Sequence, residues 1–376
     1  MTLRSSLFQR IVLPGLAFKA IVIGGGYATG RELAEYFIPG GPWGGLAGMA
    51  LTMVIWSVVC MITFLFAQTV NAPDYGTFFG SLLGPLSPAF EIAYVIVVTI
   101  ALSVFGAAAG SIGAALFGWP LLVGTLCLIG CIALIAAFGN NSVERLFKWV
   151  SIFLYATYAI FLVIAIGKFG GRMADSFAAT SLPAARDWMQ GGLTYAGYNV
   201  FAAAVILSVV SRHVTTTRDA ITAGLLSGPL AIIPGILFFI CMCAYYRQIG
   251  AQTLPSDFLL VRLGLPAFRF IFQLMIFFAL LESGTGMIHS INERIAASWR
   301  ARRGAELREG RRFAISAAFL VGSIFLAERL GLVTLIAKGY RVLAALVLVI
   351  FLLPLMTYGL WRVVRRSDTA ATTVAR

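Results

Sequence analysis

The chain alternates long apolar runs with short polar segments. A run of about 20 apolar residues is long enough to cross a bilayer as an α-helix. We therefore predict an all-α polytopic membrane protein with ten transmembrane helices, together with a short surface helix over residues 252–264 that opens with Pro255. The predicted spans cover residues 8–37, 43–68, 88–116, 119–138, 143–167, 187–210, 219–247, 265–298, 311–328 and 339–364.

The composition supports this prediction. The sequence is 60% hydrophobic and 11% charged, and its mean hydropathy is +0.92. Soluble proteins carry roughly a quarter charged residues, so the soluble globular class is excluded. We expect a single transmembrane domain over residues 1–376.

The net charge of +13 does not indicate a nucleic-acid partner, because the arginines gather beside predicted spans. An excess of basic residues there is typical of cytoplasmic loops. We expect a bacterial-type inner-membrane protein whose two ends face the cytoplasm, with residues 365–376 as a cytoplasmic tail. Its partners are then membrane lipids and a small solute, and the protein is a monomer or a homodimer. The clustered arginines are Arg300, Arg302, Arg303, Arg308, Arg311, Arg312, Arg362, Arg365 and Arg366.

The first predicted span contains the sequence IVIGGGYATGRELAEYF, in which three glycines, Gly24, Gly25 and Gly26, precede Tyr27. Each glycine inside a helix costs up to about 1 kcal/mol, so the triplet favours an opened backbone. Unpaired backbone groups at that depth persist only beside protein or a wet cavity. Binding is the interpretation we favour, and a close packing contact is the alternative.

Charged residues follow this triplet at once, although charges that face lipid are costly. Arg31 and Glu35 are four residues apart on a helix and can form an ion pair. The sequence assigns no role to Arg31, Glu32 or Glu35.

The sixth predicted span carries a second interruption, in the sequence GGLTYAGYNVFAAA. Tyr195, Tyr198 and Asn199 are polar residues amid apolar helix, and each either contacts a solute or forms an internal hydrogen bond that holds the break open. Four further spans follow each interrupted span. Two five-span repeats, over residues 1–167 and 187–364, are typical of inverted-repeat transporters. The free N–H groups of an opened half-helix suit a carboxylate, and the opposing carbonyl groups suit a cation or an ammonium group.

The eighth predicted span carries the sequence LLESGTGMIHSINER, in which Glu282, Gly286, His289 and Glu293 fall on one helical stripe. A carboxylate in the membrane is stable when it holds a proton or when a cation neutralises it. We predict that Glu282 carries a coupling proton or ligates Na⁺ and that His289 relays protons. The alternative is a polar seam between helices. Ser283 and Thr285 add hydroxyl groups nearby.

Other motifs indicate structure rather than chemistry. The five cysteines lie inside apolar runs without a CxxC pair, so we expect core residues rather than metal ligands or disulfides. The glycines Gly106 and Gly110 predict close helix packing. Lys148 is expected at the cytoplasmic interface, with a gating ion pair as the alternative. No catalytic triad, zinc spacing or phosphate loop occurs in a suitable context, so we expect neither an enzyme nor a cofactor.

Three stretches, GGGYATGRE, GYNVFAAAVIL and ESGTGMIHSINER, resemble the YkvI-like membrane proteins of the amino acid–polyamine–cation superfamily. More distantly, spans six and eight are similar to the branched-chain amino acid:cation symporters, and the segment from Ser142 resembles the fifth helix of LeuT. The resemblance implies the LeuT-type fold with five-plus-five inverted repeats and alternating access. It also implies that the solute is held where the first helix opens at Gly24–Tyr27 and the sixth at Tyr195–Asn199.

In sodium-coupled relatives, an ion lies between the first-helix break and two hydroxyl residues of helix eight. Glu282 and Ser283 match those two positions. Ser283 fits the pattern of a Na⁺ site, whereas Glu282 departs from it and favours a proton. The sequence therefore predicts an ion-coupled symporter, with H⁺ favoured over Na⁺, for an amino acid or a related carboxylate-bearing metabolite. A passive channel and a non-transporting sensor are the alternatives.

Overall fold

The apolar runs fold as helices in the computed structural model, which describes residues 6–137, 140–303 and 309–365. Every regular element within these ranges is helical, so the all-α prediction is confirmed. The elements up to residue 178 are η1 (Phe8–Val12), α1 (Leu13–Val22), α2 (Gly25–Ala28), α3 (Arg31–Tyr36), η2 (Ile38–Gly40), α4 (Gly41–Thr69), α5 (Tyr75–Leu83), η3 (Gly84–Leu86), α6 (Ser87–Phe117), α7 (Leu121–Ala137) and α8 (Asn140–Ala178).

The described chain after residue 178 is also helical. Its elements are α9 (Ala185–Asn199), α10 (Ala202–Val205), α11 (Leu207–Val210), α12 (Thr217–Cys243), α13 (Tyr246–Ile249), α14 (Pro255–Leu263), α15 (Pro266–Arg303), α16 (Glu309–Thr334), η4 (Leu335–Gly339), α17 (Tyr340–Val347), η5 (Leu348–Leu352) and η6 (Leu355–Gly359). The helix α14 matches the predicted surface helix and has Pro255 in its first turn. The side chain of Lys148 lies outside the described residues.

Six helical segments of the described ranges are long and apolar enough to cross a membrane, and α7 is a shorter apolar helix over Leu121–Ile135. The protein is thus a multi-pass membrane protein, while the count of ten crossings stays a prediction. The predicted first and sixth spans are missing from the six because each is divided into shorter helices. The six segments are Ile38–Thr69, Tyr75–Phe117, Phe153–Ala178, Thr217–Cys243, Pro266–Ala296 and Ala314–Arg365.

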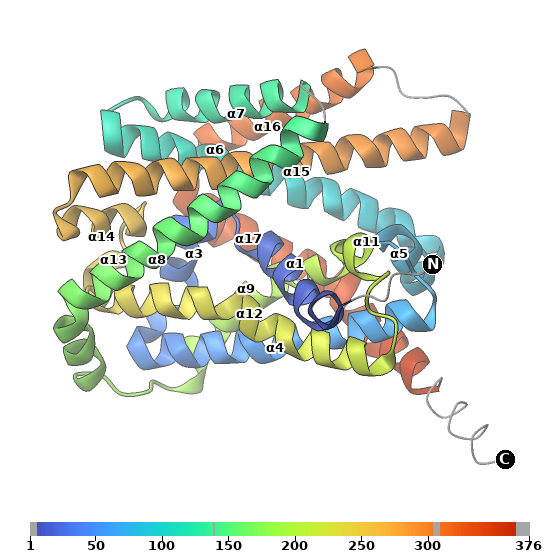
Figure 1. Cartoon of the computed structure of the whole chain (residues 1–376), viewed down its shortest axis with the longest axis horizontal. Coiled ribbons are helices and arrows are strands. Elements are labelled where there is room, and N and C mark those ends of the chain that lie inside the picture. The colour runs from blue at the N-terminus through green and yellow to red at the C-terminus, as the bar shows by residue number, and fades with distance from the viewer. Residues whose placement is uncertain (1–5, 138–139, 304–308, 366–376) are drawn as a thin grey trace.

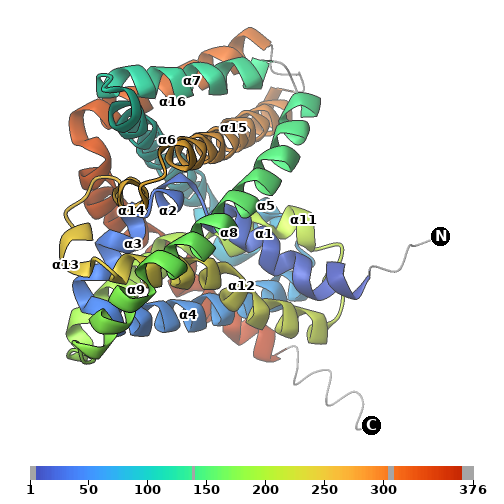
Figure 2. The same cartoon turned by 60° about the vertical axis from the view of Figure 1, so that its left-hand side comes forward.

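The long helices form two groups that meet along the middle of the molecule (Figures 1 and 2). One group contains α1, α4, α9 and α12, and the other contains α6, α7, α15 and α16. The helix α8 runs diagonally past both groups (Figure 2). The beginning of α1 and the end of the last helix lie in the half of the bundle opposite α13 and α14 (Figure 1).

Small residues allow helices within a group to approach closely. A Cβ atom at Gly110 of α6 would lie 2.5 Å from the backbone oxygen of Leu121, and one at Gly124 of α7 would lie 2.4 Å from that of Ala109. Real Cβ atoms do not approach that closely, so glycine is required at both positions. The predicted packing role of the Gly106–Gly110 pattern is therefore confirmed for the contact between α6 and α7.

The first span is broken at the start of the predicted stretch Gly24–Tyr27, although Gly25, Gly26 and Tyr27 themselves form a helical turn. The helix α1 ends at Val22, and Ile23 has a ψ of 72°, which no helix accommodates. A single turn, α2, follows, and the chain then turns again at Gly30, whose φ is +77°. Glycine suits that left-handed conformation because it has no Cβ atom. The outer half-helix α3 therefore starts in a new direction at Arg31.

The sixth span is interrupted slightly later than predicted. Residues Tyr195–Asn199 belong to α9 and are helical, so the expectation that they form the opened segment is wrong in position. The helix changes at Val200 and Phe201, where backbone bonds tighten to three-residue spacing, and again at Ile206. All three residues keep right-handed helical dihedral angles. The polar side chains of Tyr195–Asn199 do not prevent a helix. Tyr198 and Asn199 form hydrogen bonds, and the ring of Tyr195 packs among other aromatic rings.

Candidate functional site

A cavity of about 330 Å³ lies between the two helix groups, directly below the break in the first span. Its walls come from α1, α6, α8, α15 and the segment of the sixth span from Phe201 to Val205. Most of the lining is apolar, and the few polar groups are concentrated on a small number of helices. The polar lining residues are Lys19, Tyr94, Tyr155, Glu282, Ser283 and Ser290.

Glu282 faces this cavity from α15 and is partly buried. Among the described residues, it has no hydrogen-bond or ion-pair partner. Ser283 lines the same cavity, so the structure brings these two predicted residues together. Further along the helix, the hydroxyl group of Ser290 forms a 2.8 Å hydrogen bond with that of Tyr94 in α6. The carboxyl group of Glu282 is therefore available to an ion or a solute in the cavity.

The remaining predicted residues of α15 are placed differently. Thr285 is buried, and its hydroxyl group has no partner among the described residues, but it does not line the cavity. His289 is partly buried and also lies off the cavity face. The cavity face of α15 instead follows Glu282, Gly286 and Ser290 at four-residue spacing. The predicted stripe is thus displaced by one position at His289, and the side chain of Glu293 lies outside the described residues.

Tyrosine side chains gather above the cavity, around the outer halves of spans one and six. The ring of Tyr198 lies 4.5 Å from that of Tyr340, 5.6 Å from that of Tyr195 and 6.0 Å from that of Tyr36. The ring of Tyr195 also packs edge-on against Phe37, at 5.0 Å. The structure therefore brings the two predicted tyrosines of α9 beside α3.

Glu32 lies inside this group of aromatic residues and is buried. The hydroxyl group of Tyr198 donates a 2.6 Å hydrogen bond to Oε2 of Glu32. The other carboxyl oxygen lies against the glycine triplet, since a Cβ atom at Gly26 would be 2.1 Å from Oε1. A carboxyl group of the chain itself thus fills the space beside the first break.

Three tyrosine hydroxyl groups near this centre have no hydrogen-bond partner among the described residues. They belong to Tyr27 in α2, Tyr158 in α8 and Tyr195 in α9, and all three side chains are buried. Tyr27 and Tyr195 lie close enough to Glu32 to interact with it electrostatically, and Tyr158 lies close enough to Tyr27. Leaving a buried hydroxyl group unpaired costs about 1–3 kcal/mol, so these groups are candidates for ligand contacts.

Two of the predicted binding residues make contacts within the chain instead. The side-chain amide of Asn199 donates a 3.1 Å hydrogen bond to the backbone oxygen of Tyr195, one turn back in its own helix. This matches the alternative of an internal hydrogen bond. Gly24 lies over the ring of Phe105, with 3.6 Å between that ring and an added Cβ atom. Gly25 begins α2, and its burial lies outside what the structure describes.

Polar contacts cover the α3 side of the site. The guanidinium group of Arg31 donates 2.7 Å and 2.8 Å hydrogen bonds to the backbone oxygens of Gly250 and Gln252, between α13 and α14. It also pairs with Glu35 at 2.5 Å, as the spacing predicted. The backbone N–H of Ser256 donates to the backbone oxygen of Thr29. The connection through α13 and α14 is thus fastened over the outer half of span one.

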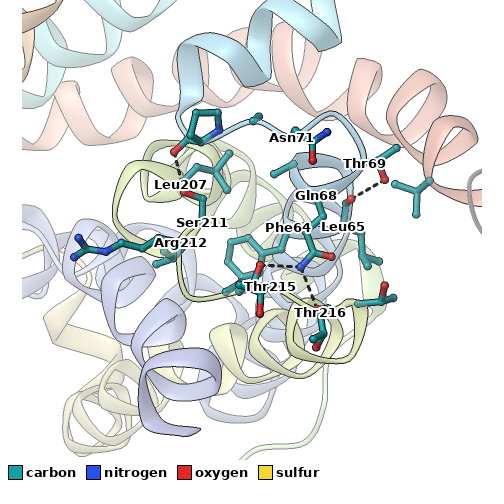
Figure 3. A pocket seen from close by; sticks show the side chains of 17 residues that line it. Phe64, Leu65, Gln68, Thr69, Asn71, Leu207, Ser211, Arg212, Thr215 and Thr216 are labelled. Atoms are coloured by element: carbon teal, nitrogen blue, oxygen red, sulfur yellow. Dashed lines mark hydrogen bonds between the residues drawn. The ribbon is translucent and has the colours of Figure 1, made fainter. Parts of the chain in front are cut away.

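A larger recess, of about 900 Å³, lies at the far end of α4, beside α11 and the start of α12 (Figure 3). Several of its polar groups are already used by the chain. The amide of Gln68 donates hydrogen bonds to the backbone oxygens of Val214 and Thr216 (Figure 3). The hydroxyl group of Ser211 donates one to the backbone oxygen of Pro73. None of its described lining residues belongs to the predicted set. We therefore place the candidate site at the smaller cavity.

Sequence reasoning missed three residues of this region. Glu32 was left without a role, and neither Lys19 nor Tyr158 was assigned to the site. The ammonium group of Lys19 lies 4.0 Å from the centre of the Tyr155 ring, a cation–π contact at the cavity wall. The sequence does contain a signal that could have identified these three residues, because each is a charged or phenolic residue inside an apolar run. The described residues contain no cluster of three metal-ligating side chains and no disulfide.

No family model matches the chain. The chain is similar to the uncharacterized membrane protein YkvI of Bacillus subtilis (strain 168), with 25% identity over 293 residues, which cover 73% of this chain and 78% of YkvI. The predicted resemblance to the YkvI-like membrane proteins is therefore confirmed.

Solved structures of transporters share the fold. A Na⁺-coupled sialic acid symporter in a substrate-bound outward-open state matches 95% of this chain and 82% of its own, with a TM-score of 0.60 and 12% identity. MhsT in complex with L-phenylalanine matches 96% and 97%, with a TM-score of 0.56 and 15% identity. A manganese transporter of Eremococcus coleocola matches 91% and 77%, with a TM-score of 0.53 and 15% identity. The predicted LeuT-type fold is confirmed by these likenesses.

Proposed function

We propose that the protein is an ion-coupled secondary active transporter for a small polar solute, of the amino-acid class or a related carboxylate-bearing metabolite. The observation that carries this proposal is the cavity below the first break, which contains an unpaired carboxyl group at Glu282. The break itself is covered on the outer side by Arg31 and the α13–α14 connection. A binding centre that is covered on one side and borders a cavity on the other corresponds to one of the two states of alternating access.

The solute is proposed to bind around Gly24–Tyr27, with Tyr195 and Tyr198 of α9 beside it and the cavity below. Covered breaks favour a transporter over a passive channel, because a channel needs a continuous polar path. Both described chain ends lie in the half of the bundle opposite α13 and α14 (Figure 1), and the arginines clustered beside the predicted spans support the proposal that this side faces the cytoplasm.

Glu282 is proposed to couple transport to H⁺ in preference to Na⁺. A single carboxyl group is enough to hold a proton, whereas a Na⁺ site needs several oxygen ligands around one point. Ser283 offers one hydroxyl group at the cavity, but Thr285 does not face it. If the ion and the solute both stabilise the same closed state, each raises the affinity for the other. That mutual effect is the coupling free energy between the two sites.

The test uses the purified full chain in proteoliposomes, with a solute first identified by thermal-shift screening of amino acids and organic acids. Wild-type protein is expected to accumulate the solute when an inward H⁺ gradient is imposed. The variant Glu282→Gln is expected to reach a concentration ratio of about one while it still exchanges solute across the membrane. The matched control Glu328→Gln removes an exposed carboxylate of α16 and should accumulate solute normally.

Other outcomes identify the alternatives. If a Na⁺ gradient drives uptake and an H⁺ gradient does not, the coupling ion is Na⁺ rather than H⁺. Uptake that stops at equilibrium under every gradient would identify a channel, and binding without exchange would identify a sensor. Normal accumulation by Glu282→Gln would show that Glu282 is not the coupling group.

A further inference from the structure

We propose that Glu32 and the tyrosines around it bind a positively charged amino group of the transported solute. This inference rests on the proposed function and names the chemistry of the solute at the first break. The ligand class is a primary amine, either free or as part of a zwitterion.

A carboxyl group of the chain already occupies the space beside the break. Oxygen Oε1 of Glu32 fills the position next to Gly26, where an added Cβ atom would lie only 2.1 Å from it. The opened glycine segment would otherwise offer its N–H groups to an anion. A solute carboxylate placed there would meet the carboxyl group of Glu32, so the break favours a positive group.

The described residues supply no cation for Glu32. Its neighbour Arg31 points outward, to Gly250, Gln252 and Glu35. Lys19 contacts the ring of Tyr155 at the cavity wall. The four ion pairs of the described residues do not include Glu32, whose hydrogen bond comes from the neutral hydroxyl group of Tyr198. A buried ionised carboxylate is costly without an opposite charge, and an ammonium group would supply that charge.

The centre also has unused capacity for hydrogen bonds. The hydroxyl groups of Tyr27, Tyr158 and Tyr195 are buried without partners among the described residues. A proton on Glu32 provides one donor, whereas an ammonium group provides three. One of these donors can go to the Glu32 carboxylate, and the others remain for unpaired oxygens such as the Tyr195 hydroxyl in the same aromatic group. The faces of the tyrosine rings packed around Tyr198 also attract a cation.

The cavity provides room for the rest of the solute. It reaches Ile23, which is the residue where α1 breaks, and it includes Phe105, whose ring lies under Gly24. Glu32 itself is not among the described lining residues of the cavity, so a solute with its amino group at Glu32 and its body in the cavity must extend past Ile23 and Gly24 at the first break. Apolar lining there suits an aliphatic or aromatic body.

The experiment uses two matched series of probes on the purified full chain, with the thermal shift measured as each probe is titrated. One series is alanine, lactate and ethylamine, and the other is phenylalanine, phenyllactate and phenethylamine. In each series the second member lacks the amino group and the third lacks the carboxylate. We expect the two amines of at least one series to bind and the hydroxy acid to bind on the order of tenfold to a hundredfold more weakly, which is the range for losing a charged hydrogen bond.

The variant Glu32→Gln should remove this preference for the amine. Its matched control is Glu35→Gln, one helical turn away, whose carboxylate faces Arg31 and which should keep the preference. If Glu32→Gln does not fold, Tyr198→Phe removes only the hydrogen bond to Oε2 and should weaken amine binding while leaving hydroxy-acid binding unchanged.

Several results would overturn the inference. These are equal binding of amines and hydroxy acids, no binding of any amine, or an unchanged preference in Glu32→Gln. A melting temperature that depends on pH through Glu32, without any preference for amines, would make Glu32 a proton site instead. Gradient-driven uptake of a solute that lacks an amino group would reject this inference and leave the proposed transporter standing. Amine binding without any transport would reject the proposed transporter and leave the amine site at Glu32 standing.

Discussion

The two halves of the first span meet at the same break but are held in different ways. The outer half, α3, is fastened by hydrogen bonds: Arg31 reaches across to α13 and α14, and the hydroxyl group of Tyr36 donates to the backbone oxygen of Ile336 at 2.6 Å. The inner half, α1, packs mainly through apolar contacts such as that of Phe18 with Trp56, whose ring centres are 5.5 Å apart, and its start is tied by one partly exposed ion pair between Arg10 and Asp219. Next to Lys19 and Ile23 it borders a cavity.

This difference indicates how the site opens. Opening on the α3 side must break the directional hydrogen bonds of Arg31 to Gly250 and Gln252, so this side should resist opening more strongly. Apolar packing beside a void tolerates small displacements, so α1 should move more gradually. In the structure, the α3 side of the break is covered by the α13–α14 connection and the α1 side borders the 330 Å³ cavity. Substitutions in each half can show whether the outer half is in fact the more firmly held of the two.

The largest expected effect comes from Arg31→Ala. It removes a buried guanidinium group and leaves two carbonyl groups and Glu35 without their donor. Breaking a buried pair costs about 3–5 kcal/mol. Hydrogen exchange of the backbone amides around residues 250–256 should therefore become at least about a hundredfold faster, as measured by mass spectrometry.

The control for Arg31→Ala is Arg262→Ala. Arg262 lies in α14, stacks over the ring of Phe258 and bonds Gln248, so these contacts stay within the outer connection. It should change exchange at residues 250–256 only slightly. Equal effects of the two variants would show that Arg31 does not hold the connection to α3.

The next largest effect is expected at the glycine triplet. In Gly26→Ala, the new methyl group would meet Oε1 of Glu32 at 2.1 Å, so the carboxyl group must move and its bond with Tyr198 is disturbed. Overpacking of this kind costs about 1–3 kcal/mol. We expect a lower melting temperature and, if the amine inference holds, amine binding weaker by about tenfold, measured by thermal-shift titration.

Gly24→Ala is the matched control because its methyl group would make an ordinary 3.6 Å contact with Phe105. Because the new methyl group meets no clash and Gly24 has no positive φ, the change should alter stability by less than about 1 kcal/mol. If Gly24→Ala weakened amine binding more than Gly26→Ala, the binding centre would lie lower, at the cavity, rather than beside Glu32.

Much of the fold was predictable because membrane spans follow from apolar length, and because glycine inside such a run marks a broken helix. The break at Ile23 and Gly24 was found in this way. The break in span six was predicted too early because Tyr195, Tyr198 and Asn199 are polar, whereas the structure keeps them helical. A polar residue in an apolar helix indicates a partner somewhere, but not a change in the backbone.

The candidate site was less predictable, since it depends on which side chains of distant spans face each other. Glu282 and Ser283 were identified by their own chemistry, and the structure places both at the cavity. Glu32 carries the same chemical signal. Its significance depends on its contacts with Gly26 and Tyr198, and Tyr198 is 166 residues away along the chain and adjacent only in three dimensions.

The smallest expected effect concerns the inner end of α1, where Arg10 pairs with Asp219 at 2.7 Å. Arg10 is 37% exposed, and Asp219 also caps α12 through Thr216, so Arg10→Gln leaves the cap in place. Asp219 is 6% exposed and accepts hydrogen bonds from both Nε and Nη2 of Arg10, so the pair should contribute about 1 kcal/mol, the upper end for exposed pairs, and high salt weakens it. The apparent melting temperature should fall by at most about 2–4 °C, and exchange at the start of α1 should rise only slightly. Asp219→Asn removes the pair and weakens the cap, so it should cost more. A loss in Arg10→Gln as large as that in Arg31→Ala would mean that both halves of the span are latched equally, and the asymmetry between them would disappear.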